Sequence, residues 1–368
     1  MSDHVKYTII PGNIEEAVDI IGLMGYLGVK KVEVVLFENL FSRPDALPFS
    51  GSVELDIKYF PAGCGARRIT KLVAYLLRGA PTVVCVGAQL AYQRIAFFLV
   101  RKKIKLMVYN RGLLADISKS PILSLRLLRT IPRCLRKYRL LNPYLADYSL
   151  VLGDSNGRML RKYGVQNTYS VGLFPTRRGV IFEPNEARRF KKTTVVLITQ
   201  AYRSHGMLEQ ANQQIIFLEK MIALLGELSA DCILRVHPRD LDDYSSIVDV
   251  REINREGKQS FINRCVDMKL HGENVVLISP PSTFLVEWVN NKLQAILYKN
   301  SLINDIYESF YDSLKGDYGL SDSVGFLKPL FDIMELQYKE VNTENMGEIY
   351  SEDGRKALVK SMVLNGLL

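Results

Sequence analysis

Short apolar runs alternate with longer amphipathic stretches along the chain, and this alternation restricts the fold more than any other feature of the sequence. Neighbouring parallel strands need a long crossover, usually a helix, so strands and helices alternate in a parallel sheet. The alternation therefore predicts an α/β fold. A chain of 368 residues is too long for one ordinary core, so two domains are expected.

The first half of the chain, residues 1–173, is predicted to form an N-terminal Rossmann-like domain. Its predicted strands are Tyr7–Ile10, Val32–Phe37, Val53–Phe60, Thr82–Val86, Ile104–Tyr109, Asp147–Leu152 and Tyr169–Val171. Its predicted helices begin at Ile14 and cover Arg67–Leu77 and Leu90–Val100. Residues 174–192 carry prolines, a glycine and basic residues without periodicity, which predicts a linker.

The second half restarts with a β-branched run and is predicted to form a C-terminal domain over residues 193–335. Its predicted strands are Thr193–Thr199, Cys232–Val236, Val275–Ser279 and Gln294–Tyr298. Its predicted helices are Leu208–Leu228 and Ser282–Asn290, and residues 336–368 are expected to form a C-terminal helical segment. The simplest architecture is two Rossmann-like domains facing across a cleft, with ligands beyond the carboxyl ends of the strands.

Composition and motifs exclude several classes of protein. No apolar run reaches the length of about 20 residues that spans a membrane, and the polar residues Met1–Lys6 do not predict a secretory signal. The five cysteines form no disulfide or metal pattern, and Cys85 and Cys232 fit a buried apolar role, so a cytoplasmic protein is expected. The motifs of dinucleotide dehydrogenases, P-loop kinases, zincins and α/β-hydrolases are absent, and no cofactor or metal is predicted.

The net charge of +9 is concentrated in one segment. Between Arg101 and Arg139, twelve Lys or Arg stand against the single acid Asp116. Within Leu123–Leu141, helical spacing places four basic residues on one stripe: Arg126, Arg129, Arg133 and Arg136. An ordinary surface helix explains the stripe about as well as an anionic partner does. Among anionic partners, the inner face of a membrane is favoured over nucleic acid, because no nucleic-acid-binding signature is present.

Polar residues follow three strands of the second half, where a ligand of such a sheet would lie. They are His205, the run His237-Pro238-Arg239, and Ser279, Ser282 and Thr283. Each has a structural explanation, because Ser and Thr cap helices and a histidine after a buried strand is often structural. Folding does not require them together, so the group predicts a functional site.

The order of strand, His-Pro, strand, Ser-rich turn and helix resembles the HP and S motifs of bacterial sialyltransferases and polysialyltransferases. The resemblance covers mainly Thr193–Tyr298. Those enzymes have a GT-B fold and are inverting glycosyltransferases that use CMP-activated sialic acid. The resemblance implies metal-independent transfer of a sialic-acid-like sugar from a CMP-linked donor to a bacterial surface glycan. Related motifs occur in capsule Kdo transferases and CDP-glycerol polymerases, so CMP-Kdo and CDP-glycerol are alternative donors.

The resemblance also implies roles for individual residues. His237 would meet the donor phosphate and assist the departure of CMP, in a donor site shared with Pro238 and Arg239. The hydroxyls of Ser279, Ser282 and Thr283 would contact the phosphate or the sugar carboxylate.

The general base of the family is usually an acid beside a glycine, and this sequence departs from that pattern. The corresponding places read Ser204-His205-Gly206 and Asn110-Arg111-Gly112. His205 is therefore the predicted base, because an imidazole can accept a proton near neutral pH. On the acceptor side the prediction names Gly12, Asn13, Arg111 and Asp116. The missing acid keeps open a different class, a non-catalytic nucleotide- or polyanion-binding protein on the same fold.

Overall fold

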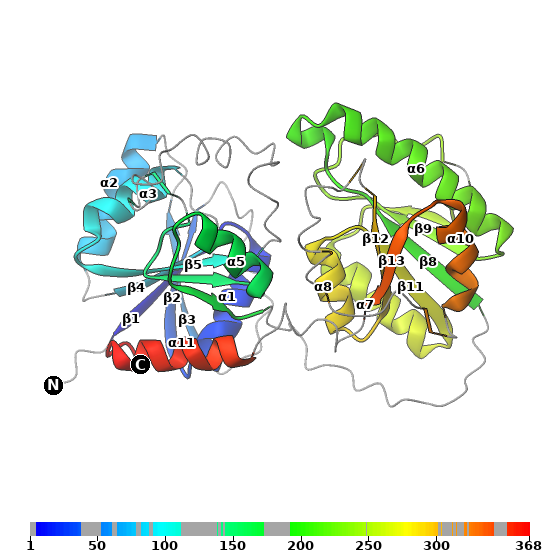
Figure 1. The fold of residues 1–368 in the computed structure, drawn as a ribbon. Helices are drawn as coiled ribbons and strands as arrows, with labels where there is room; N and C mark the ends of the chain where they lie inside the picture. The colour runs from blue at the N-terminus through cyan, green and yellow to red at the C-terminus, as the bar shows by residue number, and fades with distance from the viewer. Residues whose placement is uncertain are drawn as a thin grey trace. The chain divides into compact units, whose positions relative to one another are not determined.

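The computed structural model describes residues 5–37, 53–60, 65–78, 82–87, 91–111, 138, 141–142, 144–172, 192–247, 249–300, 303, 311, 314, 320–321, 324–341 and 352–368. These residues divide into two compact α/β units (Figure 1). The first contains the described residues up to 172 together with 352–368, and the second contains those from 192 to 341.

The first unit is built on a seven-stranded parallel sheet, sheet A, with the strand order β3-β2-β1-β4-β5-β6-β7. Its strands are β1 Lys6–Ile10, β2 Lys31–Phe37, β3 Glu54–Phe60, β4 Thr82–Val86, β5 Ile104–Asn110, β6 Tyr148–Val151 and β7 Thr168–Ser170. Its helices are α1 Ile14–Tyr26, α2 Gly65–Leu77, α3 Ala91–Val100, α5 Asp154–Lys162 and α11 Glu352–Leu364. The order of the strands reverses between β1 and β4, so the switch point of this Rossmann-like sheet lies there.

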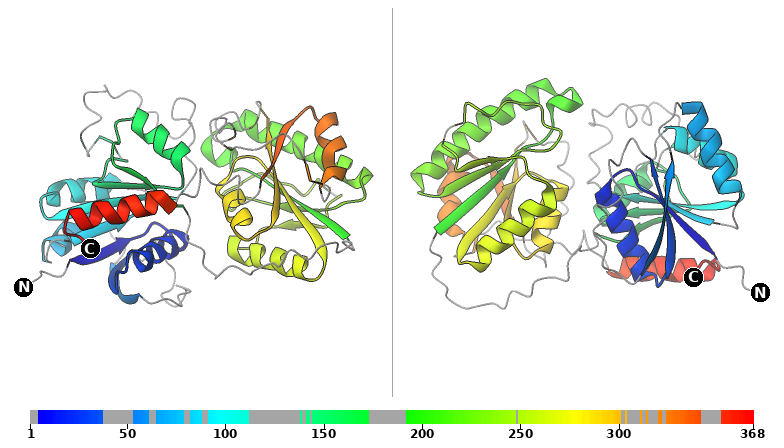
Figure 2. Two further views of the ribbon diagram at one scale, coloured as in Figure 1. Left: turned by 60° about the horizontal axis from the view of Figure 1, so that its bottom comes forward. Right: turned by 180° about the vertical axis from the view of Figure 1, so that it is seen from behind.

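Both faces of sheet A are covered by apolar helix stripes. On one face, α1 and α11 contribute Ile20, Met24, Leu358 and Met362 to a core with the strands. On the other face, Leu72 and Leu76 of α2 and Phe97 and Val100 of α3 pack on the strands. The two views in Figure 2 show these helix pairs on opposite faces of the sheet. A sheet covered on both faces favours strands that are apolar at nearly every position, as β4 is: all five of its residues are buried and four of them are apolar.

The second unit is built on a six-stranded sheet, sheet B, with the strand order β10-β9-β8-β11-β12-β13. Its strands are β8 Lys192–Ile198, β9 Asp231–Arg235, β10 Glu252–Asn254, β11 Glu273–Ser279, β12 Gln294–Lys299 and β13 Gln337–Val341. Its helical elements are the 3-10 turn η3 Arg203–His205, α6 Leu208–Glu227, α7 Lys258–Leu270, α8 Thr283–Asn290, η5 Gly325–Leu327 and α10 Lys328–Ile333. All strand pairs are parallel except β12 with β13. The switch point of sheet B lies between β8 and β11.

Most of the predicted strands and helices are present, and Cys85 and Cys232 are buried as predicted. Burial also raises the pKa of the Cys232 thiol to about 12, which keeps it protonated. No helix of the described part of the chain is long and apolar enough to cross a bilayer.

The expectation of one helical segment over residues 336–368 is wrong. Gln337–Val341 is a strand that pairs antiparallel with β12, because alternate residues of it are buried and its backbone completes the edge of sheet B. Helix α11 instead belongs to the first unit. A Cβ on Gly354 would lie 2.1 Å from the Ser170 carbonyl oxygen, and Arg355 Nε donates to the Val171 carbonyl at 2.6 Å. Lys192, placed in the linker by the sequence, is the first residue of β8.

Candidate functional site

The parallel register of sheet B brings the predicted donor-site residues to one edge. Strand β8 pairs with β9 on one side and with β11 on the other. His205 follows β8, His237 follows β9, and Ser279 ends β11, so all three lie at carboxyl ends of neighbouring strands. This edge includes the switch point of the sheet, where open α/β sheets bind their ligands.

His237 is held in one orientation by backbone hydrogen bonds. Its N–H donates to Thr199 Oγ1 at 2.9 Å, and its ring Nδ1 accepts from the Arg239 N–H at 3.1 Å. Because Nδ1 is an acceptor, the proton of the neutral ring is on Nε2. Burial, together with the nearby charges of Arg239, Arg235, His205 and Lys258, lowers the pKa of His237 from 6.5 to about 4, and burial is the largest cause. The imidazole is therefore neutral near pH 7 and offers an Nε2–H donor.

A buried hydrogen-bond network supports the loops that carry the two histidines. Gln214 of α6 accepts from the Gln200 N–H at 2.7 Å and donates to the Tyr244 hydroxyl at 2.9 Å. Tyr244 in turn donates to Asp240 Oδ2 at 2.7 Å. Gln200 follows β8 and Asp240 follows β9, so the network ties the His205 loop to the His237 loop. An ion pair between Arg203 and Asp242 makes a second tie between the same loops.

We expect Gln214→Leu to lower the free energy of unfolding by about 1–3 kcal/mol, because it leaves buried polar groups of Gln200 and Tyr244 without this partner. Gln213→Leu is the matched control, because Gln213 directly precedes Gln214 in α6 and is only half-buried. This variant should change the free energy of unfolding by no more than about 0.5 kcal/mol. Urea unfolding of the two variants measures the difference. Equal stability of both would show that the network adds nothing to the fold.

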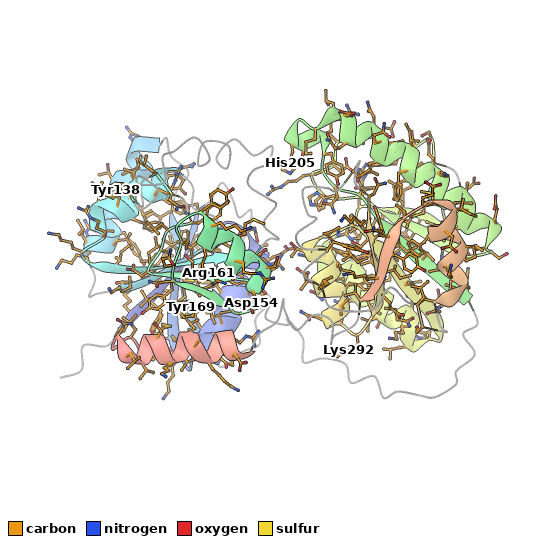
Figure 3. All side chains as sticks on the ribbon, viewed as in Figure 1. Tyr138, Asp154, Arg161, Tyr169, His205 and Lys292 are labelled. Carbon is orange, nitrogen blue, oxygen red and sulfur yellow. The ribbon has the colours of Figure 1, made fainter. Side chains whose placement is uncertain are left out.

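His205 lies in the turn where the chain leaves β8 and enters α6 (Figure 3). Its side chain is exposed, and its backbone N–H donates to the Tyr202 carbonyl at 3.0 Å. Gly206 ends the turn with a φ of 75°, a conformation that strongly favours glycine. The exposed ring is therefore carried on a defined turn, within electrostatic range of His237.

The Ser-rich turn after β11 forms the amino end of α8. Ser282 is the N-cap and accepts from the Leu285 N–H at 3.1 Å, and Thr283 is the first helical residue. Ser279 is fully buried, and its hydroxyl donates to the Pro280 carbonyl at 2.6 Å and lies 3.1 Å from the Ser282 hydroxyl. Ser279 therefore shapes the turn, while the positive end of α8 faces the same sheet edge as His237.

One further residue of this edge, Lys258, was not predicted from the sequence, whereas Glu287 was noted there as the acid one turn into the helix after the Ser-rich turn. Lys258, the first residue of α7, forms a 2.7 Å ion pair with Glu287 of α8, and both side chains are largely buried. Lys258 is also among the cations that lower the pKa of His237. Lys258 could have been noticed in the sequence as a basic residue directly after Glu256-Gly257. It was missed because helix α7, which begins at Lys258, was not predicted.

Arg235 and Arg239 add positive charge beside His237. The buried Arg235 guanidinium lies 5.2 Å from the ring centre of Phe261 and 5.1 Å from that of Phe284, between α7 and α8. Pro238 and Arg239 are exposed at the rim. Both arginines lower the pKa of His237, so their charges act at this imidazole, where they would favour an anionic ligand.

In the first unit, the predicted residues Gly12 and Asn13 follow β1 at the switch point of sheet A. Asn13 caps α1 by accepting from the Glu16 N–H at 2.8 Å, and Glu16 Oε2 accepts from the Gly12 N–H at 2.8 Å. A Cβ on Gly87, directly after β4, would lie 1.9 Å from Glu16 Oε2, so a larger residue there would displace this carboxylate. Glu16 was not predicted, although its position three residues after Asn13 is the sequence signature of a capping box.

Arg111, predicted on the acceptor side, is held by two acids of α1. Its Nε lies 2.5 Å from Asp19 Oδ2, and one terminal nitrogen lies 2.8 Å from Glu15 Oε2. The other acceptor-side prediction, Asp116, and the predicted membrane-facing stripe of Arg126, Arg129, Arg133 and Arg136 lie outside the described residues. Among the described residues, no three His, Cys, Asp or Glu side chains are grouped so that they could hold a metal ion.

No protein-family model matches the chain, and no curated protein matches its sequence. The glycosyltransferase of kitacinnamycin has a TM-score of 0.49 at 11% identity, covering 99% of this chain and 100% of that chain. The α/β-galactoside α-2,3-sialyltransferase from Photobacterium phosphoreum has a TM-score of 0.47 at 12% identity, covering 84% and 96%. MnaA from S. aureus in complex with UDP has a TM-score of 0.52 at 12% identity, covering 99% and 98%. Together with the two parallel-dominated sheets, the similarity to MnaA gives this chain the GT-B-like α/β fold that its sequence predicted.

Proposed function

We propose that this protein is a glycosyltransferase that transfers a sialic-acid-like sugar from a CMP-linked donor to a bacterial surface glycan. The reaction inverts the anomeric centre and uses no metal ion or other cofactor. The acceptor is a glycan or lipid-linked glycan at the inner face of the membrane, which the cytoplasmic enzyme reaches as a peripheral protein.

One observation carries the proposal: a neutral histidine with a fixed Nε2–H donor lies among positive charges at the switch edge of sheet B. His237 supplies the donor, Arg239 and Arg235 supply charge, and the capped amino end of α8 adds a helix dipole. A leaving phosphate gains negative charge as the bond to the sugar breaks. Preorganised donors and cations at that position stabilise the transition state more than the ground state.

The proposed reaction is a single displacement. The acceptor hydroxyl oxygen forms a bond to the anomeric carbon while the bond from that carbon to the phosphate oxygen breaks. The hydroxyl proton passes to His205, and the electron pair of the broken bond remains on the phosphate of CMP. His237 donates its Nε2–H to this phosphate without giving up its proton, because its lowered pKa makes the ring a hydrogen-bond donor and not a cationic acid near pH 7.

Two alternatives make different predictions about the ligand. Other nucleotide-linked donors, among them CMP-Kdo, CDP-glycerol and UDP-sugars, would use the same cationic edge; MnaA, of similar fold, binds UDP. A non-catalytic nucleotide- or polyanion-binding protein would keep the edge without a working base.

We expect cytidine nucleotides to raise the melting temperature more than uridine or guanosine nucleotides do. A ligand that binds only the folded protein stabilises it by about 2.7 kcal/mol at 100 times its Kd. Thermal unfolding with CMP, CDP, UMP, UDP and GDP measures this directly. Arg239→Gln should reduce the CMP shift, whereas Arg251→Gln should leave it unchanged, because Arg251 pairs with Asp231 and Glu273 at the amino edge of the same sheet.

A UDP shift as large as the CMP shift would remove the CMP-sugar assignment. Equal CMP shifts in the two arginine variants would place the nucleotide elsewhere than beside His237. Release of CMP from CMP-sialic acid then separates an enzyme from a binding protein, since only an enzyme consumes the donor.

A further inference from the structure

The outer side of helices α2 and α3 is unusually basic. Between residues 65 and 105 the chain has nine Lys or Arg and no Asp or Glu. Most globular surfaces intersperse both signs of charge. The absence of acids over a pair of adjacent helices and the start of β5 therefore produces a field of one sign on this part of the first unit.

The charges gather at one corner of the first unit. Helices α2 and α3 lead into the parallel strands β4 and β5, so the carboxyl ends of both helices lie at the amino edge of sheet A. The Thr82 N–H donates to the Lys103 carbonyl at 3.4 Å, which joins the starts of these two strands. We call this the α2–α3 corner and define it by six exposed residues: Leu77, Arg78, Leu99, Arg101, Lys102 and Lys103.

Large apolar side chains are exposed among these charges. Leu77 is 51% exposed and Leu99 is 59% exposed, and Ile95, one turn before Leu99 on α3, is 39% exposed. The inward sides of the same helices are already filled by buried residues such as Leu76 and Phe97, so the core does not need these leucines. Figure 2 shows α2 and α3 side by side on one face of the sheet.

Arg101 shows how a cation and an apolar surface combine here. Its guanidinium lies 4.2 Å from the ring centre of Phe98, and one terminal nitrogen donates to the Phe98 carbonyl at 2.8 Å. The long side chain thus covers an aromatic ring while its charge stays at the surface. This is the behaviour of basic residues at a membrane interface.

Helix dipoles explain only part of this pattern. Cations are favoured at the carboxyl ends of helices, which accounts for Arg78 and for the run from Arg101 to Lys103. A dipole does not account for the exposed leucines or for the lack of acids along both helices. A surface for single-stranded nucleic acid would present exposed aromatic rings for bases to stack on, and a duplex would need only cations, whereas this corner combines cations with exposed leucines.

We propose that the α2–α3 corner docks on the surface of a bilayer that contains anionic phospholipids. The cations pair with lipid phosphates, and Leu77 and Leu99 enter the boundary between headgroups and acyl chains. The contact is interfacial, since no helix of the described residues could span a bilayer. The proposal deepens the proposed function, because it names a surface for the peripheral membrane contact stated there. It uses other residues than the stripe Arg126 to Arg136. Vesicle binding is measured without donor or acceptor, so its failure is distinguishable from a failure of sugar transfer.

The test is co-sedimentation of the full chain with vesicles of phosphatidylcholine alone and of phosphatidylcholine mixed with phosphatidylglycerol. The wild type should bind the mixed vesicles much more tightly than the phosphatidylcholine vesicles, because the cations contribute only on the anionic surface. Each basic residue near an anionic surface changes partitioning about fivefold. Changing Arg78, Arg101, Lys102 and Lys103 to Gln should therefore weaken binding at least roughly tenfold at low salt. Leu77→Gln with Leu99→Gln should remove the fraction that stays bound at high salt, because apolar contacts are not screened.

Matched controls come from elsewhere on the chain. Lys30, Lys220, Lys356 and Lys360 are exposed, and changing them to Gln removes the same charge. Val363→Gln with Leu364→Gln changes two exposed apolar residues of α11, on the opposite face of sheet A. Both controls should bind as the wild type does. The proposal is overturned if the wild type does not bind the mixed vesicles, or if it binds heparin but no vesicle. It is also overturned if each control variant loses as much vesicle binding as the corner variant to which it is matched.

Discussion

His237→Ala should fold normally and lose roughly 10²–10³-fold in turnover at saturating donor, the size of effect seen when one preorganised transition-state donor is removed. The half-buried ring accepts one hydrogen bond, from the Arg239 N–H, and is not part of the apolar core. The bond from the His237 N–H to Thr199 is a backbone bond that alanine keeps, so loss of the ring should not unfold the unit. The measurement is CMP release from CMP-sialic acid in the presence of acceptor. His271→Ala is the matched control, because this exposed histidine caps the carboxyl end of α7, at the amino edge of sheet B.

His237→Gln distinguishes a neutral donor from a cationic acid. A glutamine amide can donate a hydrogen bond to the phosphate but cannot supply a proton, so it should restore part of the turnover if the ring acts as the neutral Nε2–H donor. Turnover of the wild type should also show no step from His237 between about pH 6 and 8, since its pKa is lowered to about 4. Wild-type turnover in His237→Ala would remove this residue from the site.

The same residue should affect stability in acid. Its pKa is 6.5 in the unfolded chain and about 4 in the folded one, so between these values the unfolded chain holds a proton that the folded protein lacks. The free energy of unfolding therefore falls as the pH falls from 6.5 toward 4, and His237→Ala should lose less over this interval. Urea unfolding across this pH range measures how the free energy of unfolding changes with pH in the wild type and in His237→Ala. Parallel slopes would contradict the neutral, buried state of the ring.

His205→Ala should abolish transfer and leave CMP binding unchanged, because the proposed base contacts the acceptor hydroxyl and not the nucleotide. Only the neutral imidazole accepts a proton, so wild-type turnover should rise with pH to a plateau. The side chain is exposed on a turn closed by Gly206, so its removal should not affect folding. Initial rates across a pH series, together with the CMP thermal shift, separate the two effects.

His205→Asp should restore part of the transfer with a lower pH optimum, since a carboxylate then stands where the resembled family places its acid. Normal transfer by His205→Ala, or an unchanged rising limb, would reject His205 as the base. Two acids of the first unit would then be tested. Asp116 was named by the sequence, and Glu16 lies beside Gly12 and Gly87 at the switch point of sheet A.

Local signals in the sequence determined most of the secondary structure and the general position of the candidate site. Buried runs such as Val83–Val86 and Val275–Ile278 are apolar at every position because both faces of each sheet are covered. The helix starts at Asn13 and Ser282 were readable because a capping side chain acts on residues only a few positions away. The segments that form strand β13 and helix α7 carry neither an uninterrupted apolar run nor a clear capping residue. Their stability comes from pairing and packing with distant segments, which no local window contains.

Tertiary structure alone decided the chemistry of the site. Lys258 and Glu287 are 29 residues apart and meet only because α7 and α8 pack on the same face of sheet B. The protonation state of His237 depends on burial and on cations from other elements, and the sequence contains neither quantity. The C-terminal helix could be expected from its sequence, but its place on sheet A follows from the fit of Gly354 against Ser170. The spacing of apolar residues within a segment decides whether it forms a helix or a strand. Which side chains meet is decided by the pairing register between strands that are distant in the sequence.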